Sequence, residues 1–283
     1  MSCGQYVLGF YSVVAVINYR VRYNYTKYAS SSQKAAQQNA AFFVFLSFIE
    51  IFMTQNKPLA STRWHTFSAQ ESLNHAAVTR ILQAANEAIA KHGSFSIVLA
   101  GGSTPKTIYA MLAKADTDWA KWHVYINDDR CLPVDDDERN SKMVNEVWLS
   151  HVSIPNNQFH AIACELGPIE GAKTYNKTLA NVGTFDLVLF GLGEDGHTAS
   201  LFPGHVVDNS ADVVPVFNSP KPPAERVTMS QNRLNNTKEA LFLVTGSGKQ
   251  AAVNAWRGGE SIPAALITPA CGVDVYCFAV DLN

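Results

Sequence analysis

Residues 95–114 read FSIVLAGGSTPKTIYAMLAK, and this stretch decides the fold class of the chain. Its first part, Phe95 to Ala100, is a short apolar run typical of a strand buried in a sheet. A glycine turn follows, and the helical stretch Lys106 to Lys114 comes directly after it. A strand that passes through a tight turn into a helix indicates an α/β fold, because parallel strands are joined through crossovers that are usually helical.

The alternation of helices and strands continues on both sides of this stretch. Upstream, Ser68 and Glu71 form a capping-box pattern at the start of a helix. Apolar residues then recur at helical spacing from Leu73, and Gly93 supplies a helix stop. A later helix is expected from Lys249. We expect further strands at residues 123–126, 185–190, 240–244 and 275–280. This order predicts a mostly parallel sheet with both faces covered, in which ligands bind beyond the carboxyl ends of the strands.

The composition limits the class of protein. The chain has 283 residues, enough for one large domain or two small ones. Apolar residues make up 47% and charged residues 16%, which excludes a disordered chain, a coiled coil and a collagen-like repeat. The net charge of −2 gives no basic field that would point to nucleic-acid binding. The five cysteines form no CxxC pair or metal-ligand spacing, so we expect reduced thiols in a cytoplasmic protein with no metal and no cofactor.

The first 52 residues differ in composition from the rest. They contain one acidic residue and no proline, and they are rich in aromatic residues. Two apolar runs, residues 6–17 and 40–52, are each too short to span a bilayer. We therefore predict that residues 1–52 are an extension outside the fold, with Met53 as the natural start and one α/β domain at residues 64–283. The alternative is a real anchor or targeting segment.

The turn Gly101-Gly102-Ser103-Thr104 is a candidate anion site. It lies between a strand and a helix. Glycines let the backbone approach a ligand closely, exposed amides at a helix start favour an anion, and the two hydroxyl groups add donors. The alternative is a plain strand-to-helix turn.

A second glycine loop, residues 245–249, reads TGSGK and resembles half of a nucleotide P-loop. The full pattern needs a glycine where Leu243 stands, so the Walker interpretation fails. Small residues followed by Lys249 at a helix start still form a cradle of phosphate size. The alternative is a solvated lysine at a helix start.

The loop after the strand at residues 185–190 contains Gly191, Gly193 and Gly196, which formally spell GxGxxG. A dinucleotide fold would continue directly into a helix and place an acidic residue about 20 positions later, and neither feature is present. The informative residues are Asp195 and His197. Histidine can take up a proton near neutral pH and an acid can orient it, so His197 is a candidate general base, with a structural histidine as the alternative.

Arg130 lies just past the end of the strand at residues 123–126. Its planar guanidinium suits bidentate contact with phosphate, and the alternative is an ion pair with Asp128 or Asp129. Arg226, which opens a strand-like run after the Pro-rich, linker-like patch at residues 219–223, is a second candidate. The acidic run that begins at residue 135 is interpreted as a solvated loop face.

Five blocks of sequence resemble the 6-phosphogluconolactonase family, from about Trp64 to the C-terminus. They are SIVLAGGSTP (96–105), VYINDDRCLP (124–133), FDLVLFGLGEDGHTASLFPG (185–204), RVTM (226–229) and LFLVTGSGKQ (241–250). The third block is highly specific to that family. The resemblance implies a three-layer α/β/α sandwich with a mostly parallel, Rossmann-like central sheet. It also implies hydrolysis of 6-phospho-D-glucono-1,5-lactone in the oxidative pentose phosphate pathway.

The resemblance further implies a role for each candidate site residue. His197 is the general base, and Asp195 orients it or its loop. The substrate and its phosphate are bound by Gly101, Gly102, Ser103, Thr104, Asp128, Arg130, Arg226 and Lys249. Water attack on an activated ester carbonyl needs a base and donors for the oxyanion, but no covalent nucleophile and no metal. The family usually reads Asp-Glu-Arg where this chain has Asp128-Asp129-Arg130, which leaves the role of Asp129 open.

Two other functions stay open as alternatives. The sibling glucosamine-6-phosphate deaminases share the fold and an Asp-Gly-His loop, but they usually carry a glutamate at the position of Phe202, whose apolar ring cannot relay a proton. A non-catalytic sugar-phosphate sensor usually carries a DNA-binding helix-turn-helix, which residues 1–52 do not show, and retention of His197 argues for catalysis. We expect a monomer or weak homo-oligomer that takes a small phosphosugar lactone, with no nucleic-acid partner and no membrane partner for residues 53–283.

Overall fold

The computed structural model describes residues 61–282. The extension predicted at residues 1–52 and the start predicted at Met53 lie outside the described residues. The strands of the described part are β1 (Thr62–Thr66), β2 (Phe95–Leu99), β3 (Trp122–Ile126), β4 (Asp128–Arg130), β5 (Phe159–His160), β6 (Leu187–Gly191), β7 (Val213–Val216), β8 (Arg226–Met229), β9 (Ala240–Thr245) and β10 (Val273–Phe278). Its α-helices are α3 (Gln70–His92), α4 (Ser103–Leu112), α5 (Asn140–Val147), α6 (Gly167–Leu179), α7 (Gln231–Asn235) and α8 (Gln250–Arg257).

Seven strands form one sheet in the order β1-β10-β9-β6-β2-β3-β5, and every neighbouring pair in it is parallel. A separate three-stranded sheet, β4-β8-β7, is antiparallel. In the strand order, β3 lies next to β2 toward one edge of the large sheet, whereas β9 lies next to β6 toward the opposite edge. Because β2 and β6 are neighbours, the connections diverge between them. Such a topological switch point is where open α/β sheets form a crevice for ligands.

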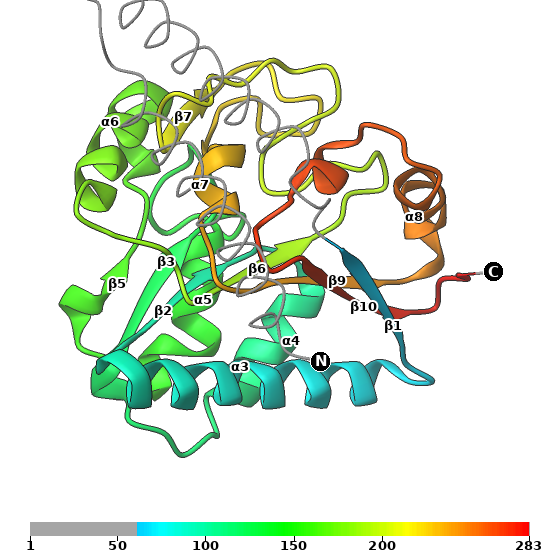
Figure 1. Cartoon of the computed structure of the whole chain (residues 1–283). Coiled ribbons are helices and arrows are strands. Elements are labelled where there is room, and N and C mark those ends of the chain that lie inside the picture. Colours follow the sequence, from blue (N-terminus) through cyan, green and yellow to red (C-terminus); the bar gives the residue numbers. More distant parts are fainter. Residues whose placement is uncertain (1–60, 283) are drawn as a thin grey trace, which may run out of the picture. The chain divides into compact units, whose positions relative to one another are not determined.

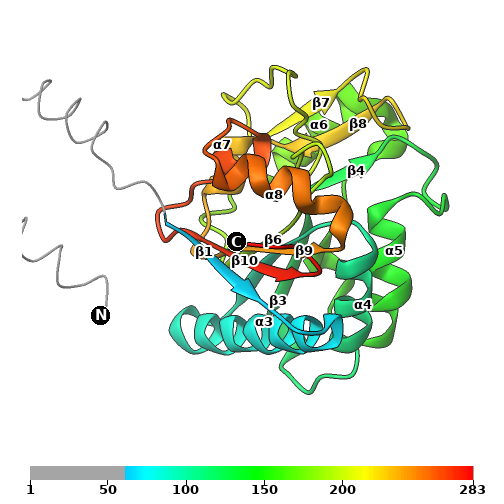
Figure 2. The same ribbon diagram turned by 90° about the vertical axis from the view of Figure 1, so that its right-hand side faces the viewer.

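Helices cover both faces of the large sheet. Figures 1 and 2 show α3 and α4 on one face and α8 on the opposite face. Helix α6 packs against β7 and β8, and Figure 2 shows this group on the same side of the sheet as α8. The structure therefore has the three layers that the sequence predicts, and the fold class is confirmed. The predicted sheet is mostly parallel. In the structure the large sheet is parallel throughout, and the antiparallel strands form the separate small sheet.

The central strands hold the loops of the sheet edge on a rigid base. Ile97, Val124, Leu189 and Phe242, one from each of β2, β3, β6 and β9, have no exposed surface. The rings of Phe190 and Phe242 stack with their centroids 4.6 Å apart across β6 and β9. Burying a side chain of this size contributes about 1.5–3 kcal/mol. The loops that follow these strands are thus fixed at their first residues.

The long helix α3 follows its predicted end but not its predicted start. Its N-cap is Ala69, and no side chain caps the first turn, so the predicted capping box of Ser68 and Glu71 is wrong. Ser68 lies one residue before the cap position, from which a hydroxyl group does not form that box. At the other end Gly93 adopts a φ of 87°, the left-handed conformation expected of a glycine helix stop.

Candidate active site

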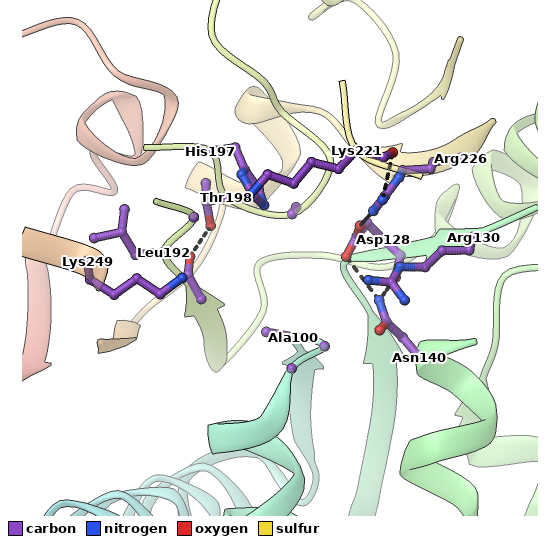
Figure 3. A pocket seen from close by; sticks show the side chains of 15 residues that line it. Ala100, Asp128, Arg130, Asn140, Leu192, His197, Thr198, Lys221, Arg226 and Lys249 are labelled. Atoms are coloured by element: carbon purple, nitrogen blue, oxygen red, sulfur yellow. Dashed lines mark hydrogen bonds and ion pairs between the residues drawn. The ribbon is translucent and has the colours of Figure 1, made fainter. Parts of the chain in front are cut away.

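A cavity of about 210 Å³ opens at the carboxyl ends of the parallel strands. The segments that follow β2, β3, β6 and β9 all contribute to its wall, which places it at the switch point between β2 and β6. Figure 3 shows the side chains that line it. Seven of the residues predicted from the sequence are among them: Gly101, Gly102, Asp128, Arg130, His197, Arg226 and Lys249.

His197 and Asp195 form a hydrogen-bonded pair at this cavity. The Nδ1 atom of His197 lies 2.5 Å from Oδ1 of Asp195. The same carboxylate oxygen accepts a hydrogen bond from the His197 backbone amide at 3.2 Å. When Nδ1 carries the proton that is donated to Asp195, Nε2 is the ring nitrogen that can accept a proton from a bound molecule. The pair therefore has the arrangement of a general base with its orienting acid. Asp195 itself does not line the cavity.

The surroundings of His197 favour its neutral form. Burial is the largest cause and lowers the pKa of His197 below its ordinary value, Asp195 acts in the opposite direction, and the charge of Lys221 adds to the lowering. Burial also acts to raise the pKa of Asp195, but the hydrogen bond and charge of His197 outweigh it, so the pKa of Asp195 lies below its ordinary value. At neutral pH a neutral imidazole thus faces an ionised carboxylate.

Two glycines let the loop after β6 fold tightly around His197. A Cβ atom on Gly193 would lie 2.0 Å from Nδ1 of His197. Gly196 adopts a φ of 84°, and a Cβ atom there would lie 2.8 Å from Ile262. The Gly193 amide also donates a hydrogen bond to the His197 carbonyl at 2.7 Å. The glycines that formally spell a dinucleotide motif therefore shape the loop that presents the histidine.

Besides Arg226, three cationic side chains reach the cavity from separate segments: Arg130 from β4, Lys249 after β9 and Lys221 from the Pro-rich patch at residues 219–223. Neither lysine amine has a hydrogen bond or ion pair within the described part of the chain. Unpaired cations around a cavity favour an anionic ligand such as a phosphate. No group of three or more His, Cys, Asp or Glu side chains that could hold a metal ion occurs among residues 61–282.

The guanidinium of Arg130 is held by the loop that follows it. Its Nη1 donates to the carbonyl of Glu138, and its Nε is buried without a hydrogen-bond partner. The alternative ion pair with Asp128 or Asp129 is not formed, because these carboxylates pair with Arg226 and with Arg139 respectively. Arg130 therefore still has donors that can meet a bidentate anion.

Asp128 and Arg226 are buried wall residues with partners inside the protein. The Ser200 hydroxyl donates to Oδ2 of Asp128 at 2.5 Å, and the Asn140 side-chain amide donates to its Oδ1 at 3.3 Å. Nη1 of Arg226 lies 4.0 Å from Asp128, while its Nε and Nη2 donate to backbone carbonyls of residues 221–223. Burial raises the pKa of Asp128. Arg226 thus shapes the wall, and a contact of Arg226 with phosphate stays a prediction.

Asp129 is fully buried and fastens β4 to the start of α5. Its carboxylate accepts hydrogen bonds from the backbone amides of Arg130 (2.9 Å) and Asn140 (2.7 Å), the Ser141 hydroxyl (2.7 Å) and Nε of Arg139 (2.9 Å). A carboxylate at the first residues of a helix satisfies amides that have no partner within the helix. Asp129 therefore holds two wall residues, Arg130 and Asn140, without lining the cavity itself.

Only part of the turn after β2 lines the cavity. Gly101 lines the cavity, and a Cβ atom on it would lie 2.0 Å from Oδ1 of Asn140, so the close approach of this backbone requires glycine. Ser103 and Thr104 do not line the cavity. The Thr104 hydroxyl instead forms a hydrogen bond of 2.6 Å with the Thr245 hydroxyl, which links α4 to the end of β9.

Lys221 and Asn140 are among the eight wall residues that were not predicted as site residues from the sequence. Lys221 lies between prolines in a patch whose composition indicates a linker, and a single lysine there carries no sign of a site. Asn140 follows an acidic loop at the start of a helix, where asparagine is ordinarily a capping residue. Only the return of both segments to the sheet edge places them at the cavity.

Comparison with known proteins identifies the family. Residues 68–276 match the family model described as glucosamine-6-phosphate isomerases/6-phosphogluconolactonase. The chain is 37% identical over 218 residues to a 6-phosphogluconolactonase of Mycobacterium tuberculosis, covering 70% of this chain and 88% of that protein. It is 36% identical over 206 residues to a protein of Oryza sativa named probable 6-phosphogluconolactonase 4, chloroplastic, covering 66% of this chain and 64% of the rice protein.

Solved structures agree with the sequence relatives. A 6-phosphogluconolactonase of Thermotoga maritima matches with a TM-score of 0.73 and 26% identity, covering 77% of this chain and all of that chain. The Trypanosoma brucei 6-phosphogluconolactonase matches with a TM-score of 0.70 and 25% identity, covering 77% of this chain and 97% of that chain. The chain therefore belongs to the glucosamine-6-phosphate isomerase/6-phosphogluconolactonase family.

Proposed function

We propose that this chain hydrolyses 6-phospho-D-glucono-1,5-lactone to 6-phospho-D-gluconate, the lactonase step of the oxidative pentose phosphate pathway. Its relatives in Mycobacterium and rice and its structural neighbour in Thermotoga are named 6-phosphogluconolactonases. The observation that carries the proposal is the pair of His197 and Asp195 at a cavity with unpaired cations. A base beside an anion site suits general-base catalysis of the hydrolysis of a phosphorylated lactone.

Arg130 and Lys249 bind the phosphate in this proposal. Both line the cavity, Arg130 from the end of β4 and Lys249 from the turn that follows β9. Holding the phosphorylated end fixes the position of the lactone ring, and positioning of this kind lowers the entropic part of the barrier. Gly101 and Gly102 line the same cavity, where we expect their backbone amides to add neutral donors.

His197 acts as the general base and then as the general acid. Its Nε2 takes a proton from a water molecule while the water oxygen attacks C1 of the lactone. The tetrahedral intermediate collapses when the bond between C1 and the ring oxygen breaks, and His197 returns the proton to that oxygen. Asp195, ionised beside Nδ1, stabilises the imidazolium in between. The product is a carboxylic acid that ionises at neutral pH.

The neighbours of His197 argue against the deaminase alternative. At the position where that family usually carries a glutamate, this chain has Phe202, whose ring centroid lies 4.8 Å from that of His197. An aromatic ring excludes water from this side of the histidine but cannot accept or donate the proton that ring opening needs. The carboxylate hydrogen-bonded to His197 is that of Asp195.

A comparison of two substrates tests the proposal. Lactone hydrolysis is followed on freshly generated 6-phosphogluconolactone with the spontaneous rate subtracted, and ammonia release is followed on glucosamine 6-phosphate. We expect lactone hydrolysis well above background and no ammonia. Ammonia release would instead support the deaminase. Binding of 6-phosphogluconate without turnover of either substrate would indicate a non-catalytic sugar-phosphate-binding protein.

Cellular location and oligomeric state stay predictions. Among residues 61–282, no helix combines the length and the apolar character needed to cross a membrane. The rice relatives are named chloroplastic. We propose a cytoplasmic monomer or weak homo-oligomer that takes a small phosphosugar lactone as its partner. Cell fractionation and size-exclusion chromatography would measure both properties.

A further inference from the structure

Lys221 is a cavity residue that has no role in the steps described above. It lines the same cavity as His197, and Figure 3 shows its side chain extended toward that histidine. Its charge acts on the catalytic pair, since it lowers the pKa of both His197 and Asp195. Its amine has no hydrogen bond or ion pair within the described residues. An unpaired ammonium beside the base is therefore available to a bound substrate.

The segment that carries Lys221 is held in place by its neighbours. The Lys221 carbonyl accepts hydrogen bonds from the Ser219 hydroxyl at 2.7 Å and from Nη2 of Arg226 at 3.2 Å. Its backbone amide donates to the Ser219 hydroxyl oxygen at 3.3 Å. Pro222 and Pro223 follow directly and restrict the backbone further. The amine is thus presented from a fixed base, as a preorganised donor requires.

The positions of Lys221 and Arg130 indicate different tasks. In 6-phosphogluconolactone the reacting carbon C1 and the phosphorylated carbon C6 are at opposite ends of the hexose chain. The base must lie beside C1, because it takes the proton of the water that attacks there. Lys221 is directed toward the base, whereas Arg130 reaches the cavity from the end of β4. A cation directed toward the base is placed for the C1 end and not for the phosphate.

We propose that Lys221 is a catalytic residue of the lactonase reaction whose ammonium donates a hydrogen bond to the carbonyl oxygen of the lactone. The inference rests on the proposed function. When water attacks C1, this oxygen gains negative charge, and a preformed cation stabilises the charged oxygen more than the neutral carbonyl. After the ring opens, the same oxygen belongs to the product carboxylate. Lys221 therefore also pairs with 6-phosphogluconate.

Steady-state kinetics of matched variants test the proposal. Lys221→Met is expected to lower kcat by about 10²- to 10³-fold, the usual effect of removing an oxyanion donor, with little change in KM. Lys221→Arg keeps a cation and should restore part of the rate. Lys249→Met removes a phosphate anchor and should mainly raise KM. Lys173→Met, on an exposed part of α6 where Lys173 pairs with Glu170, should behave as wild type.

Binding of two ligands separates the carboxylate end from the phosphate end. 6-Phosphogluconate carries both groups, whereas glucitol 6-phosphate carries the phosphate and has a hydroxymethyl group in place of the carboxylate. Calorimetry measures the Kd of each ligand. Lys221→Met should raise the Kd of 6-phosphogluconate by about tenfold or more, because one charge-assisted hydrogen bond is lost. The Kd of glucitol 6-phosphate should be unchanged. Lys249→Met should weaken the binding of both ligands by similar factors.

The outcomes distinguish failure of this inference from failure of the proposed function. A wild-type protein without lactonase activity overturns the proposed function and the inference together. An active wild type with an unchanged kcat in Lys221→Met overturns the inference alone. Equal weakening of both ligands by Lys221→Met would make Lys221 another phosphate anchor, and this also overturns the inference. Circular dichroism and thermal melting of each variant establish that it is folded.

Discussion

At the scale of single residues, the chemistry proposed for His197 depends on its neighbours in the fold. Histidine is protonated to a large extent near its ordinary pKa of about 6.5, and a protonated ring cannot act as a base. Burial moves the pKa of His197 below its ordinary value, Asp195 limits that change, and Lys221 adds to it. The hydrogen bond to Asp195 also fixes which ring nitrogen carries the proton.

The pH dependence of kcat/KM reports this lowered pKa. The active form of His197 is neutral, so activity falls as the pH drops through the pKa of His197 in the free enzyme. Because that pKa lies below the ordinary value, more than half of the plateau activity should remain at about pH 6.5. Initial rates from acid to neutral pH, each corrected for spontaneous hydrolysis, measure the profile. A midpoint above the ordinary histidine value would contradict the burial argument.

Replacing Asp195 is a separate test of the pair. Asp195 raises the pKa of His197, so Asp195→Asn should move the acid limb of kcat/KM to lower pH. The plateau should fall as well, because the imidazolium loses its anionic partner, but by less than the about 10²- to 10⁴-fold contributed by a general base. The same rate-against-pH measurement gives both quantities. An acid limb that moves to higher pH would show that Asp195 does not act on His197 in this way.

Removing the guanidinium of Arg130 should weaken substrate binding more than chemistry. A phosphate anchor acts on the ground state and the transition state alike, so Arg130→Met should raise KM with kcat nearly unchanged. One charge-assisted hydrogen bond contributes about 1.5–3 kcal/mol, which corresponds to about 10- to 100-fold in KM. Initial rates over a range of lactone concentrations measure this, with Lys173→Met as the control for loss of a cation. An unchanged KM would refute the anchor role.

How far the site could be predicted depends on where each residue lies along the chain. Residues directly after a buried strand, such as Arg130 and His197, are predictable, because the ends of parallel strands meet at one edge of the sheet. Thr104 lies in an equally suggestive turn, but its hydroxyl is taken up by Thr245 in the structure. Lys221 could not be predicted, since its place at the cavity depends on how the small sheet folds back over the large one.

At the scale of elements, the buried strands were the predictable part of the fold. β2, β3, β6, β9 and β10 all follow from apolar runs, with differences of a few residues at their ends. β4 and β5 have only three and two residues, too few to show an alternating pattern. The order of the strands could not be read from the sequence, because β6 pairs with β2 through contacts between distant segments.

The connection between β4 and α5 depends on the buried ion pair of Asp129 and Arg139, which are 0% and 2% exposed. Asp129→Ala would leave the Arg139 guanidinium buried beside unpaired amides, and breaking such a pair costs about 3–5 kcal/mol. We expect the denaturant midpoint to fall accordingly. Asp137 lies between β4 and α5 and forms an exposed ion pair with Lys142 of α5. Asp137→Ala, which breaks this pair, should leave the midpoint almost unchanged. Equal midpoints for the two variants would contradict the structural role of Asp129.

At the scale of the whole molecule, the family match and the proposed site fall in the same part of the chain. The family match covers residues 68–276, and the cavity residues fall between Ala100 and Lys249. A chain that begins at Met53 should therefore fold and keep the lactonase activity of the full chain. Thermal melting and lactonase rates of the two chains, prepared in parallel, check this prediction. An insoluble or inactive shorter chain would show that residues 1–52 contribute to folding or function.

The measurement that tests the central claim most directly is hydrolysis of freshly generated 6-phosphogluconolactone by the wild-type protein and by His197→Ala, with spontaneous hydrolysis recorded alongside. Removing the general base should lower the enzymatic rate by about 10²- to 10⁴-fold, toward the background. Binding of 6-phosphogluconate should be largely retained, because the cations of the cavity are untouched. Near-normal turnover by the folded His197→Ala protein would contradict the assignment of His197 as the base.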